Sequence, residues 1–145
     1  MNYLDKHKFD ALFLAIRRDE HGIRAKERVF SPRDEEFRWN YRDQPLEMWD
    51  QYQTQGRSEE GAVQNHTRVH PSLHWRELDV WEYIKQEKDI AVNPMYFAND
   101  GKRYRSWGCE PCTSPIESTA KTIDEVVEEL RTTKVAERSG RAQDK

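Results

Sequence analysis

Apolar positions divide the chain into a few short segments separated by long charged ones. The longest apolar run covers residues 11–16, and six apolar residues in succession predict a strand buried on both faces, as in a parallel sheet. Paired arginines follow it directly, and residues 4–8 before it are interpreted as the tail of a crossover helix. Ligands of open α/β sheets bind beyond the carboxyl ends of strands, so this strand end is a candidate site.

Helical spacing recurs in three places. Residues 75–86 carry a wide apolar stripe, and residues 45–52, with proline at the start, are predicted as a short helix. The clearest helix begins after Thr122, which is the predicted N-cap, with Glu125 completing a capping box. Its apolar positions fall at i, i+3, i+4 and i+7: Ile123, Val126, Val127 and Leu130.

The remaining segments are predicted to be irregular or extended. Residues 22–43 are dense in both charges and are expected to form a long loop with at most short helices. Residues 66–70 are predicted as a short extended segment that ends at Pro71. One clear strand among several helices predicts an α/β protein, helix-rich with few strands, whose sheet needs neighbours from another segment or another chain.

Composition restricts the class of protein. Even with six glycines added to the 35% hydrophobic residues, the apolar share stays below the roughly 45–50% of globular domains. Sixteen aromatic residues, five Trp, six Tyr and five Phe, argue against disorder. A net charge of −3 favours neither nucleic acid nor a membrane surface, and no apolar run is long enough to span a bilayer. We therefore expect a cytoplasmic protein with a thin core.

Basic side chains gather just after the predicted strand. The cluster spans twelve residues and is interleaved with Asp19, Glu20 and Glu27; its basic members are Arg17, Arg18, Arg24, Lys26 and Arg28. Arginine presents a planar fork that binds phosphate or sulfate through two hydrogen bonds, so the cluster is a candidate anion site. A solvated, salt-bridged loop is the alternative explanation for such a mixed run of charges.

A C-x-x-C pair, Cys109 and Cys112, could supply half of a zinc site, half of an iron–sulfur site, or a redox dithiol. Three histidines spaced by four residues would share a helix face, but Pro71 interrupts that stretch: His66, His70 and His74. An iron–sulfur cluster requires four thiolates and the chain has two cysteines. Metal binding is therefore disfavoured, and two buried cysteines without a chemical role are expected.

Five segments together resemble a known family. They are AIRRDE at 15–20, RAKERVFS at 24–31, WRELDVWEYI at 75–84, RSWGCEPCT at 105–113 and ERSGR at 137–141. In this order they are similar to sulfate adenylyltransferase subunit 2, the ATP sulfurylase small subunit, of the PP-loop family that includes phosphoadenylyl-sulfate reductases. The resemblance implies a partial adenine-nucleotide α-hydrolase-like, Rossmann-like fold.

The resemblance also implies a reaction: ATP and sulfate give adenylyl sulfate and pyrophosphate, with Mg²⁺ and a GTPase large subunit as partner. Arg17 and Arg18 are the expected catalytic anion contacts. The other residues expected to bind or orient the substrates are Asp19, Glu20, Arg24, Lys26, Arg138 and Arg141.

The family's phosphate-binding loop, S-G-G-K-D-S, does not occur in these 145 residues. Residues 1–145 are thus expected to be the carboxyl-terminal portion of a PP-loop small-subunit domain, with weak ATP binding and little activity on their own. Two alternatives remain open. The chain could be part of an adenylyl-sulfate or phosphoadenylyl-sulfate reductase, or a non-catalytic module that binds a partner.

Overall fold

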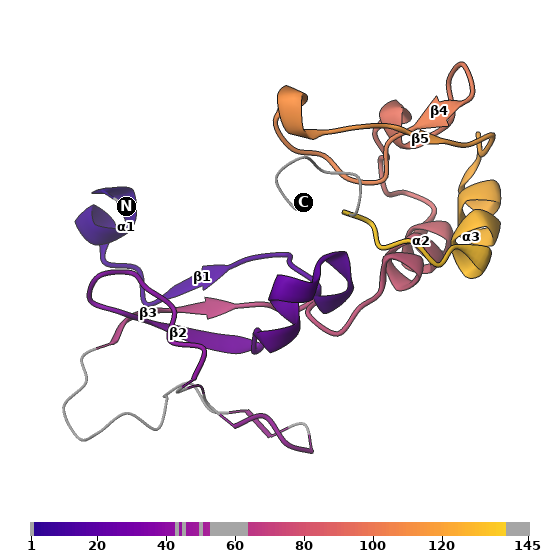
Figure 1. Ribbon diagram of the computed structural model, residues 1–145. Helices are drawn as coiled ribbons and strands as arrows, with labels where there is room; N and C mark the ends of the chain where they lie inside the picture. Colours follow the sequence, from indigo (N-terminus) through magenta and orange to yellow (C-terminus); the bar gives the residue numbers. More distant parts are fainter. Residues whose placement is uncertain (1, 43, 45, 50, 53–63, 139–145) are drawn as a thin grey trace. The chain divides into compact units, whose positions relative to one another are not determined.

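The computed structural model describes residues 2–42, 44, 46–49, 51–52 and 64–138 (Figure 1). The chain divides into two compact units. The first comprises Met1–Arg18 and Ile23–His74, and the second comprises Asp19–Gly22 and Trp75–Lys145.

The first unit is built on a three-stranded sheet. Its helix and strands are α1 (Asn2–His7), β1 (Ala11–Phe13), β2 (Phe30–Asp34) and β3 (Gln64–Val69). The strand order is β1-β3-β2, with β3 parallel to β1 and antiparallel to β2 (Figure 1). Two short 3₁₀ helices, Arg18–Glu20 and Gly22–Lys26, follow β1 in sequence. The parallel pair is the α/β feature expected from the sequence.

The prediction of a strand over residues 11–16 buried on both faces is wrong. The strand ends at Phe13, whose side chain is 69% exposed, and Ala15 is exposed as well. The reason is its position: β1 is an edge strand whose single neighbour among the described residues is β3. An apolar run shows that both faces of a strand can be buried, but burial also requires neighbours. In the described part of the chain, the face of β1 that carries Ala11 and Phe13 remains exposed.

Two further predictions in this unit need correction. The segment predicted as a loop, residues 22–43, contains strand β2, which runs beside β3. The predicted helix at 45–52 is also wrong where it is described. Met48 and Gln51 form a β-bridge, and between them Trp49 has φ 51° and is 84% exposed. Pro45 lies outside the described residues. The extended segment before Pro71 is confirmed as β3.

The second unit holds the predicted helices. Its elements are α2 (Glu77–Glu87), a 3₁₀ turn at Pro94–Tyr96, β4 (Lys102–Arg103), a 3₁₀ turn at Glu110–Cys112, β5 (Ile116–Glu117) and α3 (Ile123–Thr132). Helices α2 and α3 pack side by side, and β4 pairs antiparallel with β5 (Figure 1). The core consists of Trp81, Ala120, Val126, Val127 and Leu130.

Helix α3 begins as its sequence predicts. The backbone N–H of Glu125 donates to the Thr122 hydroxyl at 3.3 Å, and the Glu125 carboxylate accepts from the N–H of Thr122 at 3.0 Å. This capping box satisfies amide donors that the first turn of a helix leaves unpaired. Among the described residues, none of the helices has both the length and the apolar character that crossing a bilayer demands.

Candidate functional site

The segment carrying the predicted anion contacts follows the parallel strands. The N–H of Leu14 donates to the Val69 carbonyl at 2.9 Å, and the N–H of Arg18 donates to the Leu73 carbonyl at 3.0 Å. The backbone beyond β1 therefore stays beside the backbone beyond β3. Arg18 lies at the carboxyl edge of this parallel pair, where open α/β sheets bind their ligands.

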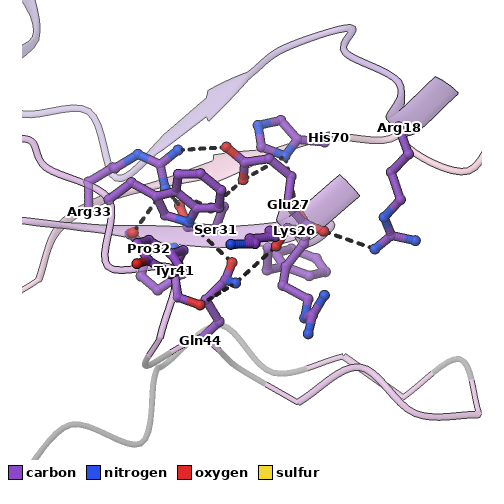
Figure 2. Close-up of polar contacts among 12 residues, drawn as sticks. Arg18, Lys26, Glu27, Ser31, Pro32, Arg33, Tyr41, Gln44 and His70 are labelled. Atoms are coloured by element: carbon purple, nitrogen blue, oxygen red, sulfur yellow. Dashed lines mark hydrogen bonds and ion pairs between the residues drawn. The ribbon is translucent and has the colours of Figure 1, made fainter. Parts of the chain in front are cut away.

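The Arg18 guanidinium is anchored by three groups of the first unit. Its Nη2 donates to the Glu27 carbonyl at 2.9 Å and lies 3.8 Å from the Glu47 carboxylate, while Nη1 is 2.9 Å from His74 Nδ1. Figure 2 shows this side chain reaching toward the Glu27 carbonyl. Its side chain remains 30% exposed, so one part of the guanidinium can still face a ligand.

The other predicted cations of the first unit lie close in sequence and differ in their surroundings. Arg17 and Arg24 are half-buried. Lys26 is exposed, with its ammonium 4.6 Å from the centre of the Tyr41 ring, a cation–π distance. The side-chain amide of Gln44 donates to both the Lys26 and Tyr41 carbonyls at 2.9 Å, which fixes the backbone here (Figure 2).

The predicted acidic partners belong to the second unit. The Asp19 carboxylate accepts the N–H of Glu77 at 2.6 Å and so caps the first turn of α2. Glu20 is buried, and Arg138 is half-buried in the segment after α3. Arg141 lies outside the described residues. The structure thus gives Asp19 a capping contact, and the orienting role expected for it and Glu20 stays a prediction.

A buried polar cluster on the β2–β3 sheet was missed by sequence reasoning. The Glu27 carboxylate accepts from Ser31 Oγ at 2.8 Å and from Arg33 Nη2 at 3.3 Å, and it lies 3.9 Å from His70 Nδ1. Arg33 Nη1 also donates to Ser31 Oγ at 2.6 Å. Figure 2 shows the carboxylate between Arg33 and His70. All four side chains are buried, so this sheet face is a polar core.

Burial controls protonation in this cluster. Burial lowers the pKa of Arg33; the Glu27 carboxylate opposes this effect and the charge of Arg68 adds to it. Burial also lowers the pKa of His70, with Arg33 and Arg68 acting in the same direction, and the Arg28 carbonyl and Glu27 acting against them. The pKa of His66 is lowered for the same reasons, burial first and then Arg68 and Arg33. Both histidines are therefore neutral at pH 7.

The paired cysteines differ from expectation. Cys109 is exposed and Cys112 is partly buried, so the prediction of two buried cysteines is wrong for Cys109. Cys109 precedes the 3₁₀ turn Glu110–Cys112 and Cys112 ends it, and the N–H of Cys112 donates to the Cys109 carbonyl at 3.0 Å. Within the described ranges, no group of three or more His, Cys, Asp or Glu side chains gathers as a metal site would require.

The second unit contains a pocket of about 430 Å³ beside the start of α2 and the segment after α3. Arg105 lies in its wall and is buried. Its guanidinium donates to both oxygens of Glu77 and to the Val135 carbonyl. Through these contacts Arg105 links the segment after α3 to the start of α2, and the Glu77 carboxylate neutralises its positive charge.

Comparison with known proteins identifies the family. Residues 1–115 match the family described as the phosphoadenosine phosphosulfate reductase domain. The chain belongs to this family. Its curated relatives include sulfate adenylyltransferase subunit 2 1 of Chromohalobacter salexigens, which is 39% identical over 97% of this chain and 54% of the relative. The sulfate adenylyltransferase subunit 2 of Methylococcus capsulatus is 40% identical over 95% of this chain and 53% of its own length.

A third relative, sulfate adenylyltransferase subunit 2 of Bacteroides thetaiotaomicron, is 38% identical over 99% of this chain and 55% of its own length. These matches confirm the resemblance inferred from the sequence. The chain spans about half the length of the curated relatives it matches. The alignments cover 167–173 positions against 145 residues here, so the relatives carry extra residues within the matched span.

Proposed function

We propose that residues 1–145 form the carboxyl-terminal portion of a nucleotidyltransferase small subunit that takes part in sulfate assimilation in the cytoplasm. The reaction joins ATP and sulfate to give adenylyl sulfate and pyrophosphate. The observation that carries this proposal is the identity of 38–40% to sulfate adenylyltransferase subunit 2 over 95–99% of this chain.

The chemistry calls for fixed positive charge. A sulfate oxygen attacks the α-phosphorus of ATP and forms the new P–O bond. The bond from the α-phosphorus to the bridging oxygen breaks, and pyrophosphate leaves with the electron pair. Positioned guanidinium and ammonium groups stabilise the charge that builds up on the leaving group. Arg17 and Arg18 are the proposed catalytic contacts at the carboxyl edge of β1 and β3, with Arg24 and Lys26 as further anion contacts.

Mg²⁺ enters this proposal as part of the nucleotide substrate. The described residues gather no set of three ligating side chains, so they do not fit a metal site held by the protein, and no step is assigned to one. The roles of Asp19, Glu20, Arg138 and Arg141 in binding or orienting the substrates belong to the same proposal.

The working enzyme is proposed to need two further components. One is the half of the relatives' length that this chain does not match, which would supply the S-G-G-K-D-S loop for the ATP phosphates. The open edge of β1, and its exposed face carrying Ala11 and Phe13, suit an additional apolar strand from that half, since parallel strands are normally covered on both faces. The other component is a second subunit, which the name "subunit 2" of the relatives favours, and the resemblance described above implies that it is a GTPase large subunit.

A chimaera tests the proposed function. Residues 1–145 replace the matched half of the Methylococcus capsulatus relative, and the product is mixed with that organism's large subunit. We expect pyrophosphate release that depends on both ATP and sulfate. A folded chimaera that releases no pyrophosphate would refute the proposal, and one that instead converts adenylyl sulfate to sulfite would favour a reductase.

Within the chimaera, Arg17→Ala is expected to weaken adenylyl sulfate binding by about 1–3 kcal/mol, the usual contribution of a hydrogen bond to a charged group. Arg38→Ala is the matched control, because Arg38 is an exposed arginine of the same unit that pairs with Asp34 and Glu36. Equal affinity of the two variants, measured by calorimetry, would remove Arg17 from the site.

A further inference from the structure

The loop between β4 and β5 is fixed at both ends. The two strands pair antiparallel, with Arg103 opposite Ile116. Arg103 is buried, and its Nη2 donates to the Glu129 carboxylate of α3 at 2.6 Å. Ser118, just after β5, donates its hydroxyl to the other oxygen of that carboxylate. One residue of α3 therefore holds both ends of the loop, and a side chain within the loop can react without breaking these contacts.

Cys109 and Cys112 lie in one hydrogen-bonded turn of this loop. The N–H of Cys112 donates to the Cys109 carbonyl at 3.0 Å, and the Thr113 hydroxyl donates to the same carbonyl at 3.0 Å. Pro111 lies between the cysteines, and its ring fixes the backbone angle φ at that position. Two donors and a proline thus define the backbone that connects the two cysteines.

A 3₁₀ turn of this kind suits a disulfide. Such a helix has about 3.0 residues per turn and rises about 2.0 Å per residue, so residues three apart share a face, with Cα atoms about 6 Å apart. Disulfides usually join residues whose Cα atoms are about 4.4–6.8 Å apart. The backbone of residues 109–112 therefore already holds the two cysteines at a separation that a disulfide can span.

The two cysteine side chains differ in exposure. Cys109 is exposed and Cys112 is partly buried, so a dissolved disulfide reaches Cys109 more readily. Redox-active cysteines commonly combine an accessible thiol with a neighbouring thiol that resolves the first product. Within the described part of the chain, no group of three or more His, Cys, Asp or Glu side chains forms around the pair. The arrangement therefore fits a dithiol better than a metal site held by this chain alone.

We propose that Cys109 and Cys112 form a redox-active dithiol that exchanges with small disulfides of the glutathione class. The Cys109 thiolate attacks one sulfur of oxidised glutathione, forms a mixed disulfide and releases one glutathione thiolate. The Cys112 thiolate then attacks Cys109 Sγ, forms the bond between the two cysteines and releases the second glutathione. The protein gives up two electrons and two protons, and oxidised glutathione takes them up as it becomes two thiols.

This site is separate from the anion contacts proposed above. It uses no arginine and neither sulfate nor phosphate, so it does not depend on the proposed reaction. In a reducing compartment the dithiol is the expected form, and the disulfide forms when oxidised small thiols accumulate. The pair would thus record the redox state of its surroundings.

Glutathione exchange of the full chain, followed by mass spectrometry, tests the order of the two steps. The chain has two cysteines, so each change in mass can be assigned to this pair. With oxidised glutathione, the reduced parent should lose about 2 Da and retain no glutathione. Cys112→Ser should stop at the mixed disulfide and retain one glutathione. Cys109→Ser, the matched variant, should react about tenfold more slowly than Cys112→Ser, because Cys112 is partly buried.

Three results of this experiment would overturn the proposal. One is a parent that keeps two glutathione molecules, because the second thiol then does not resolve the first product. Another is a parent that becomes oxidised only as a disulfide-linked dimer. The third is a Cys109→Ser variant that reacts as fast as Cys112→Ser, since the attacking thiol would then be wrongly assigned.

A second measurement tests the contribution of the folded turn. The parent is equilibrated with mixtures of reduced and oxidised glutathione, with and without denaturing urea, and the disulfide fraction is measured after acid quenching. We expect an equilibrium constant for disulfide formation about tenfold or more higher in the folded chain, because the turn removes most of the cost of bringing the cysteines together. An equal or lower constant in the folded chain would also overturn the proposal.

Discussion

Replacing Glu27 by Gln tests whether the buried polar cluster is held together by charge. Glu27 is 8% exposed and its partner Arg33 is 3% exposed, so neither side chain can turn to solvent without opening the sheet face. Gln keeps an oxygen for Ser31 and for one Arg33 N–H, but it removes the negative charge that offsets Arg33. Breaking a buried ion pair by removing one partner destabilises a protein by about 3–5 kcal/mol.

Because Gln retains hydrogen-bonding capacity, we expect a loss of about 3 kcal/mol, the lower end of that range. Equilibrium unfolding in urea measures the loss through tryptophan fluorescence. Trp39 is a local reporter, since the Arg33 guanidinium lies 5.6 Å from the centre of its ring. The matched control is Glu36→Gln, which removes an exposed partner of Arg38 and should change stability by less than about 1 kcal/mol.

A double variant strengthens the test. Glu27→Gln combined with Arg33→Met removes the unbalanced charge and should recover much of the lost stability, because apolar residues often replace a buried ion pair without loss. If Glu27→Gln costs no more than Glu36→Gln, the cluster does not depend on its charge. If the double variant is less stable than the single one, hydrogen bonding by Arg33 outweighs its charge.

Two further outcomes follow from the caps and the histidines. Thr122→Ala should destabilise the second unit by about 1 kcal/mol in urea unfolding, because the Thr122 hydroxyl accepts the Glu125 N–H. Thr122→Ser keeps the hydroxyl and should be close to the parent in stability. Equal stability of all three proteins would contradict this prediction. The folded-state pKa of His70 lies below its ordinary value, so the unfolded chain binds more protons than the folded chain. In chloride buffer the free energy of unfolding is therefore highest above about pH 6.5, and it falls as the pH drops below that value. His70→Gln should flatten that decline, and an unchanged pH profile would argue against it.

The local parts of the fold could be predicted from the sequence. The start of α3 and its buried stripe depend on residues within one or two helical turns, and the structure confirms both. The strand at residues 11–16 could not be placed correctly, because its burial depends on neighbours that pattern alone cannot supply. β2 was missed because the buried residues Ser31 and Arg33 alternate as a strand requires but are polar.

The candidate site, like the fold, has parts that the sequence could predict and parts that it could not. The arginine segment was predicted to follow a strand end, and Arg18 lies at the carboxyl edge of the parallel strands. The contacts that anchor it join residues 9 to 56 positions apart, so no local pattern could reveal them. One signal was available for the buried cluster: His66, Arg68 and His70 alternate along one segment, as do Ser31 and Arg33. Two polar stripes of period two indicate a hydrophilic sheet face.

The order of the strands has a consequence for biosynthesis. β3 is the central strand, and it is translated about thirty residues after β2 and fifty after β1. Since β1 and β2 each bond to β3 and not to one another, the described three-stranded sheet cannot begin to form while the ribosome is still decoding the intervening residues. Strand β2 therefore stays without the partner that the described sheet gives it until position 69 emerges, an interval in which chaperone binding would matter most.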